Sequence, residues 1–209
     1  NVLLGCSLSR GDGSPALDRA LLTRALTLVA ARHPALSTRI RRVDGAWRQG
    51  PGGAPPELRW VEVVDDHALA NEPFDLGEGP LQRVISDGRR VVLDGHHAAV
   101  DAWSARNLLQ ELLQVHETLR TGQDPQLPPL RSSLADAHAA LTTAPDLASQ
   151  GWWRARYADG VPPLHLPWRS PAHEPARGPC DWQQRITDHT LTAQLEALAR
   201  REGVSLPAL

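Results

Sequence analysis

The stretch DGHHAAVDAWS, residues Asp94 to Ser104, joins two segments with different hydrophobic patterns. Before it, residues 89–93 (RRVVL) have the β-branched, apolar composition of a buried strand. After it, residues 103–119 carry apolar residues at helical spacing, namely Leu108, Leu109, Leu112, Val115 and Leu119. The sequence therefore predicts a strand that delivers His96 and His97 at its end, a short loop and a helix of about four to five turns.

Short strands and helices are also indicated before this stretch. Residues 1–9 (NVLLGCSLS) and 58–64 (LRWVEVV) have strand composition, and two hairpins are expected at Asp44-Gly45 and Asp87-Gly88, because an Asp-Gly pair supports the left-handed backbone of a tight turn. Residues 16–34 predict an amphipathic helix that ends at a proline, with a buried stripe of Leu17, Leu21, Ala25, Leu28 and Val29.

Beyond residue 120 the pattern changes to helices separated by proline-rich chain. Helices are expected at 132–141 and 146–157. The second carries Trp152 and Trp153, which are expected to be core residues, with lining of a substrate channel as the weaker alternative. Residues 162–179 are too rich in proline to be helical and predict an extended crossing segment. A strand, a helix at about 192–202 and the beginning of a further element follow. The fold class is therefore α/β, a mixed and mostly antiparallel sheet flanked by helices.

Composition excludes several classes of protein. The 209 residues are 41% apolar and 22% charged, which is typical of a globular domain, and the net charge of −2 predicts no binding to nucleic acid or to an anionic membrane. Nothing in the chain predicts a signal peptide or a membrane span. Cys6 and Cys180 are far apart and form no metal-binding pattern, which favours a cytoplasmic location. Because methionine is absent, we expect the chain to be part of a longer protein.

The two histidines and Asp101 have either a catalytic or a structural interpretation. Adjacent side chains of a strand point to opposite faces, so His96 and His97 are poorly placed to share a metal ion, and no third and fourth ligand stands at zinc-site spacing. One imidazole facing a cavity is suited to move a proton near neutral pH. In the structural alternative, the histidines are satisfied at a strand end and Asp101 is only the N-cap of the following helix.

Five segments in order resemble one enzyme family. HHAAVDAWS resembles the HHxxxDG-type motif of nonribosomal peptide synthetase condensation domains, and residues 26–40 (LTLVAARHPALSTRI) resemble their RHxxLRT segment. PFDLGEGPLQR resembles the loop before their catalytic hairpin. The tryptophan-containing segment at 152–171 and the helix LTAQLEALARREGVSL match later parts of the family.

This resemblance implies a chloramphenicol-acetyltransferase-like fold of two lobes and roughly twice this length. Residues 1–175 would form the N-terminal lobe, truncated at its start, and residues 176–209 the crossover and the beginning of the C-terminal lobe. The family's active site lies in a tunnel between the lobes, which the phosphopantetheine arms of donor and acceptor carrier proteins enter from opposite faces. The domain itself is expected to bind no cofactor and no metal.

The resemblance also implies a role for each motif residue. His97 corresponds to the histidine that acts as a general base or positions the acceptor amine, which attacks the donor thioester directly. His96 is mainly structural, and Asp101 holds the loop through an arginine expected beyond Leu209. Ala102, Trp103 and Ser104 stand next to the motif as tunnel candidates.

Three departures from the family pattern leave alternatives open. Ala102 replaces the motif glycine; alanine is strained there if the backbone has positive φ, and with an ordinary backbone its methyl group merely narrows the tunnel floor. Gly95 stands where a bulky apolar residue is usual, and the hairpin at Asp87-Gly88 is short. The leading hypothesis is amide-bond condensation; the others are a related acyltransferase that uses coenzyme A or a carrier thioester, and a recruitment or scaffold module with a degenerate site. An epimerisation domain shares the motif and is a weaker candidate.

Other polar and aromatic residues are weaker site candidates. The arginines at 39, 41 and 42 predict a solvated strand face rather than a carrier-protein dock. The isolated histidines have no partner close in sequence and are expected to be ordinary surface or core residues: His33, His116, His138 and His165.

Overall fold

The computed structural model describes residues 1–142, 146–161 and 188–209. The chain divides into two units, residues 1–177 and 178–209. Within the described residues, no helix is long and apolar enough to cross a membrane.

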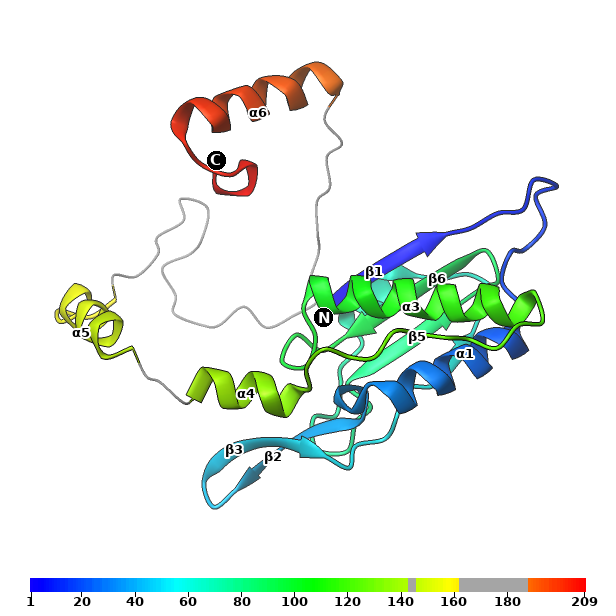
Figure 1. The fold of residues 1–209 in the computed structure, drawn as a ribbon, viewed down its shortest axis with the longest axis horizontal. Coiled ribbons are helices and arrows are strands. Elements are labelled where there is room, and N and C mark those ends of the chain that lie inside the picture. Colours follow the sequence, from blue (N-terminus) through cyan, green and yellow to red (C-terminus); the bar gives the residue numbers. More distant parts are fainter. Residues whose placement is uncertain (143–145, 162–187) are drawn as a thin grey trace. The chain divides into compact units, whose positions relative to one another are not determined.

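A four-stranded sheet forms the centre of the first unit (Figure 1). Its order is β1 (Val2–Ser7), β6 (Arg90–Gly95), β5 (Gln82–Ser86) and β4 (Leu58–Trp60). The pairs β1–β6 and β5–β6 are antiparallel, whereas β4–β5 is parallel. All five residues of β5 are buried, which is expected for a strand with neighbours on both sides and helices on its faces.

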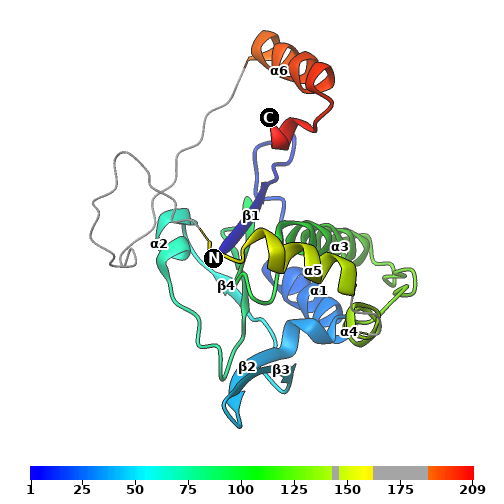
Figure 2. The same ribbon diagram turned by 90° about the vertical axis from the view of Figure 1, so that its left-hand side faces the viewer.

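Two helices cover one face of this sheet. Helix α1 (Arg19–Arg32) and helix α3 (Ala102–Arg120) lie side by side there, as Figure 1 and Figure 2 show. They share the main hydrophobic core with the inward side chains of β5 and β6, which include Val84 and Val91. The short helix α2 (Asp66–Asn71) packs on the opposite face over Ile85 and Val92. The loop that carries the two histidines thus lies between a buried strand and a helix fixed by the core.

The hairpins form where the sequence predicts them. Strands β2 (Thr38–Val43) and β3 (Ala46–Pro51) make a separate two-stranded sheet, preceded by a 3-10 turn, η1 (Pro34–Ser37). Their turn has φ of 50° at Asp44 and 78° at Gly45, which are the left-handed conformations that a two-residue hairpin requires. The Asp87-Gly88 turn joins β5 to β6 as expected.

The sequence predictions for α1 and β4 were partly wrong, and α2 was not predicted. In α1 the buried residues are Leu22, Ala25, Leu26 and Val29, whereas Leu28 is 42% exposed. The helix is apolar on more than one side, so the packing partner α3 decides which side is buried. Strand β4 ends at Trp60, whereas the predicted strand extends to residue 64. Helix α2 follows it, and because this helix spans less than two turns, no periodic pattern in the sequence predicts it.

The remaining described elements are helices. Helices α4 (Leu134–Thr142), α5 (Leu147–Arg156) and α6 (His189–Glu202) agree with the sequence predictions, and η2 (Leu206–Ala208) follows α6. The prediction that Trp152 and Trp153 are core residues was wrong, because they are 58% and 54% exposed and pack edge to face on each other. The proline-rich crossing segment and most of the strand after it lie outside the described residues, as does Cys180.

Candidate active site

The two histidines lie in a tight loop rather than in a strand. Strand β6 ends at Gly95, and α3 begins at Ala102. The backbone of His96 holds both sides of this loop: its N–H donates to the carbonyl of Leu81 (2.9 Å), and its carbonyl accepts from Ala99 (2.9 Å) and Val100 (3.2 Å). These three bonds pair the backbone of His96 with residues on both sides of the turn, which restrains its shape.

Gly95 is needed because of Val100. A Cβ atom at Gly95 would lie 2.2 Å from Cγ1 of Val100, which is far inside van der Waals contact. Val100 is 4% exposed and packs with Leu93 and Ala105 between β6 and α3. The side chain of Val100, at the other end of the loop, thus occupies the volume that a bulky residue at position 95 would fill.

The ring of His96 is half-buried and held in one tautomer. Its Nδ1 accepts a hydrogen bond from the backbone N–H of Ala98 (3.1 Å), so the proton of the neutral ring is on Nε2. The ring also packs edge to face with Phe74, with 6.0 Å between centroids. Burial lowers the pKa of His96, and the neighbouring His97 has a smaller effect in the same direction. His96 is therefore neutral near pH 7, and its ring is held by contacts within the protein.

His97 is exposed, and among the described residues its ring has no hydrogen-bond partner. The two imidazoles therefore have different surroundings, as the sequence suggested, although the geometry of a turn separates them rather than the alternation of a strand. In the part of the chain that the structure describes, no three His, Cys, Asp or Glu side chains gather in a way that would hold a metal ion.

Asp101 is the N-cap of α3. Its Oδ1 accepts a hydrogen bond from the backbone N–H of Ser104 (2.7 Å), and hydrogen bonds from Ser104 lower the pKa of its carboxyl group, with a further contribution from nearby His97. The carboxylate is exposed, so its second oxygen is accessible to a partner.

Ala102 is the first residue of α3 and has no backbone strain, since Asp44 is the only non-glycine residue with positive φ among the described residues. The alternative of a strained backbone at this substitution is therefore wrong. Trp103 is 69% exposed, and the guanidinium of Arg106 lies 5.6 Å from its ring centre. These side chains extend the exposed surface that begins at His97.

A cavity of about 220 Å³ lies beside the loop. Its walls include Ala99, Val100 and Ser104 from the loop and the start of α3, with Gln82 from β5 and His33 before η1. His33 is bound to Glu111 of α3 at 2.6 Å.

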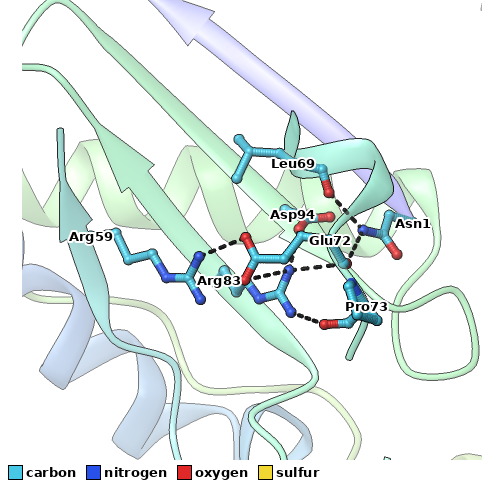
Figure 3. A network of polar contacts seen from close by, with 7 residues as sticks. All are labelled: Asn1, Arg59, Leu69, Glu72, Pro73, Arg83 and Asp94. Atoms are coloured by element: carbon cyan, nitrogen blue, oxygen red, sulfur yellow. Dashed lines mark hydrogen bonds and ion pairs between the residues drawn. The ribbon is translucent and has the colours of Figure 1, made fainter. Parts of the chain in front are cut away.

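A polar network that the sequence did not reveal lies on the α2 face of the sheet (Figure 3). Arg83 of β5 faces Asp94 of β6, with 3.3 Å between Nη1 and Oδ2. Burial raises the pKa of Asp94 to about 6, although Arg83 opposes this effect. Glu72 links Arg83 (3.4 Å) to Arg59 (2.8 Å), and the hydrogen bond from Arg59 lowers the pKa of Glu72. These residues are far apart in sequence, so no local pattern could have found them.

His116 also has a partner that the sequence did not reveal. It is 2% exposed on α3, and its Nε2 accepts a hydrogen bond from the backbone N–H of Asp18 (3.2 Å), the N-cap residue of α1. The site itself does not include His116. Among the arginines of the β2–β3 hairpin, Arg41 binds Glu78 and the carbonyl of Gly77 (2.8 Å), which ties β2 to the loop before β5.

Solved structures with the same arrangement define the class of fold. The first condensation domain of the CDA synthetase matches with a TM-score of 0.68 and 20% identity, covering 98% of this chain and 52% of that chain. The X-domain from teicoplanin biosynthesis matches with a TM-score of 0.63 and 22% identity, covering 98% of this chain and 48% of that chain. The fold is thus that of one lobe of a chloramphenicol-acetyltransferase-like domain.

The sequence comparisons then give the family. The family model of the condensation domain matches residues 12–209, so this chain belongs to the condensation domain family. It is 35% identical to phosphinothricin tripeptide synthetase PhsB of Streptomyces viridochromogenes, over 90% of this chain and 18% of that protein. It is 30% identical to malpinin synthetase of Mortierella alpina, over 80% of this chain and 2% of that protein. The chain thus spans less than a fifth of the length of these synthetases.

Proposed function

We propose that this chain forms the N-terminal lobe of a nonribosomal peptide synthetase condensation domain that makes amide bonds. Residues 1–175 form this lobe, and residues 176–209 lead into a second lobe that completes the tunnel. The donor is an acyl or peptidyl thioester on one carrier protein, and the acceptor is an aminoacyl group on another. Both substrates arrive on phosphopantetheine arms.

The observation that carries the proposal is the position of His97. It is the exposed histidine of a loop whose shape is fixed by His96, by Val100 and by the Asp101 cap. An imidazole held in this way, with no hydrogen-bond partner among the described residues, is available to a substrate.

The chemistry needs no nucleophile from the protein. The acceptor nitrogen attacks the thioester carbonyl, a C–N bond forms and the C–S bond breaks. His97 accepts the proton that the amine loses, or orients that amine, and the proton leaves with the thiol of the donor arm. Holding two tethered substrates together makes the step nearly intramolecular, which supplies much of the rate.

The test uses His97→Ala in the complete two-lobed domain, with loaded donor and acceptor carrier proteins. Removing a general base lowers turnover by roughly a hundredfold or more, so we expect product formation to fall by at least that factor. The matched control is His67→Ala, because His67 is an exposed histidine on α2 at the other face of the sheet. Turnover of His97→Ala equal to that of the wild type would refute the catalytic role.

The same assay separates the other candidate activities. A related acyltransferase would transfer the acyl group from its thioester to a free amine or alcohol without an acceptor carrier protein. An epimerase would exchange the α-proton of an aminoacyl carrier protein supplied alone. A scaffold module would bind carrier or neighbouring proteins and produce none of these products.

A further inference from the structure

Arg83 makes contacts that join the centre of the sheet to the histidine loop. It is 7% exposed, and its Nη1 binds both Asp94 Oδ2 (3.3 Å) and the carbonyl oxygen of Glu72 (3.2 Å). Its Nη2 donates to the carbonyl oxygen of Pro73. Figure 3 shows the guanidinium between the strand β6 and the chain that leaves α2.

The same guanidinium also stacks on an aromatic ring that touches His96. Arg83 Cζ lies 3.8 Å from the centre of the Phe74 ring. The Phe74 ring packs edge to face with the ring of His96 at 6.0 Å. A continuous chain of contacts therefore runs from Asp94 through Arg83 and Phe74 to His96.

An arginine is required for this combination of contacts. Its planar group donates in two directions, to the carbonyls of Glu72 and Pro73, while its face lies on the ring of Phe74. A lysine ammonium is a single point donor and does not reproduce the fork. The buried carboxylate of Asp94 supplies the opposite charge that a buried guanidinium needs.

We propose that Arg83 is a positioning residue of the condensation site, which holds Phe74 against His96 and thereby fixes the loop that presents His97. The proposal rests on the proposed function of His97. Arg83 is 7% exposed and reaches His96 only through Phe74, so its proposed role is to position the loop rather than to bind substrate. Its effect reaches the chemistry through the orientation of the imidazoles, since a small displacement of a reacting group lowers the rate strongly.

Arg59 provides the matched control. It belongs to the same network, because its Nη1 binds Glu72 Oε2 (2.8 Å) from the adjacent strand β4. Among the described residues, it makes no hydrogen bond with Asp94 and no ring contact with Phe74. A variant Arg59→Lys therefore disturbs the ion pairs of the network and leaves the aromatic contact to His96 intact.

The experiment measures single-turnover condensation by the two-lobed domain with loaded carrier proteins, for Arg83→Lys, Phe74→Leu, the double variant and Arg59→Lys. We expect Arg83→Lys and Phe74→Leu each to lower the first-order rate about tenfold, with half-saturation by the acceptor unchanged within about twofold. The double variant should be no slower than the slower single variant, since both changes break one chain of contacts. Arg59→Lys should turn over at the wild-type rate.

A wild-type rate for Arg83→Lys, or effects that multiply in the double variant, would overturn the proposal. Nitrogen-15 NMR of the His96 ring tests it separately from the chemistry. The wild type should show the Nε2–H tautomer, and Arg83→Lys and Phe74→Leu should show a mixture. If the wild-type domain makes no amide product, the proposed function fails, and the NMR result alone decides: a mixture in these variants supports the positioning role, and an unchanged tautomer overturns it.

Discussion

The contact between Gly95 and Val100 gives a sharp prediction about the shape of the loop. Gly95→Ala places a Cβ atom 2.2 Å from Val100 Cγ1, whereas Val100 Cβ (3.4 Å) and Gln82 Cγ (3.7 Å) are at ordinary distances. Overpacking of this kind destabilises a core by typically about 1–3 kcal/mol. We therefore expect Gly95→Ala to lower the free energy of unfolding by about 2 kcal/mol.

A second substitution relieves this clash. Val100→Ala removes Cγ1 together with Cγ2, which loses about 0.8 kcal/mol for each buried carbon and a further amount for the cavity, so about 2 kcal/mol in total. If the two changes were independent, the double variant would be destabilised by about 4 kcal/mol. Because the clashing atom is absent, we expect about 2 kcal/mol and hence a coupling energy of about 2 kcal/mol.

Urea unfolding of the four proteins measures this coupling, provided that the slopes of the unfolding curves agree. The control is Gly50→Ala in β3, where an added Cβ meets no atom within 4 Å, and its unfolding free energy should stay close to that of the wild type. Single-turnover condensation should fall in Gly95→Ala and recover in the double variant. Additive destabilisation by the two changes would refute the reasoning, since it would show that the loop avoids the contact by moving.

Substitutions at three further residues test individual groups. Burial raises the pKa of Asp94 from its ordinary value of 3.8 to about 6, so the folded state binds this proton more tightly than the unfolded state. The wild type should therefore lose up to about 3 kcal/mol of unfolding free energy as pH rises from about 4 to 6. Asp94→Asn should remove this loss, which pH-dependent urea unfolding measures. Burial lowers the pKa of His116 below 6.5, so protonation of the unfolded state lowers the stability of the fold as pH falls through 6.5. His116→Gln should keep the hydrogen bond from Asp18 and abolish this loss of stability at low pH. His116→Phe should instead lower the free energy of unfolding by about 1–3 kcal/mol at every pH. Asp101→Ala should cost about 1 kcal/mol in thermal unfolding, and Asp101→Asn much less, because asparagine caps a helix equally well; equal losses would contradict the capping role.

The parts of the fold that the sequence predicts are those encoded over a few neighbouring residues. Both hairpins follow from Asp-Gly pairs, and α3 follows from its apolar spacing and its cap at Asp101. The buried side of α1 was partly mispredicted because the helix has more apolar residues than one face needs, and α3 selects among them. Helix α2 has too few residues for periodicity to reveal it.

In the candidate site too, the features set by neighbouring residues were predicted, whereas those that depend on contacts between distant residues were not. The order of His96, His97 and Asp101 is local, and together with four other segments it predicted the family that the condensation-domain model confirms. The reason for Gly95 depends on Val100 after the turn, and the support of His96 depends on Phe74 and Arg83 from earlier elements. Such contacts depend on strand register and on packing across the sheet, which spacing in the sequence does not specify.

The substitution of the motif glycine by Ala102 is not evidence for a degenerate site. A glycine is indispensable where the backbone needs positive φ or where a Cβ atom meets its neighbours. Ala102 has an ordinary backbone, is exposed and begins a helix whose cap hydrogen bond is intact. Alanine is also a better helix former than glycine in a helix interior. The backbone hydrogen bonds of the histidine loop and the Asp101 cap are therefore present beside Ala102, and any effect of the extra methyl group acts on what approaches the exposed start of α3.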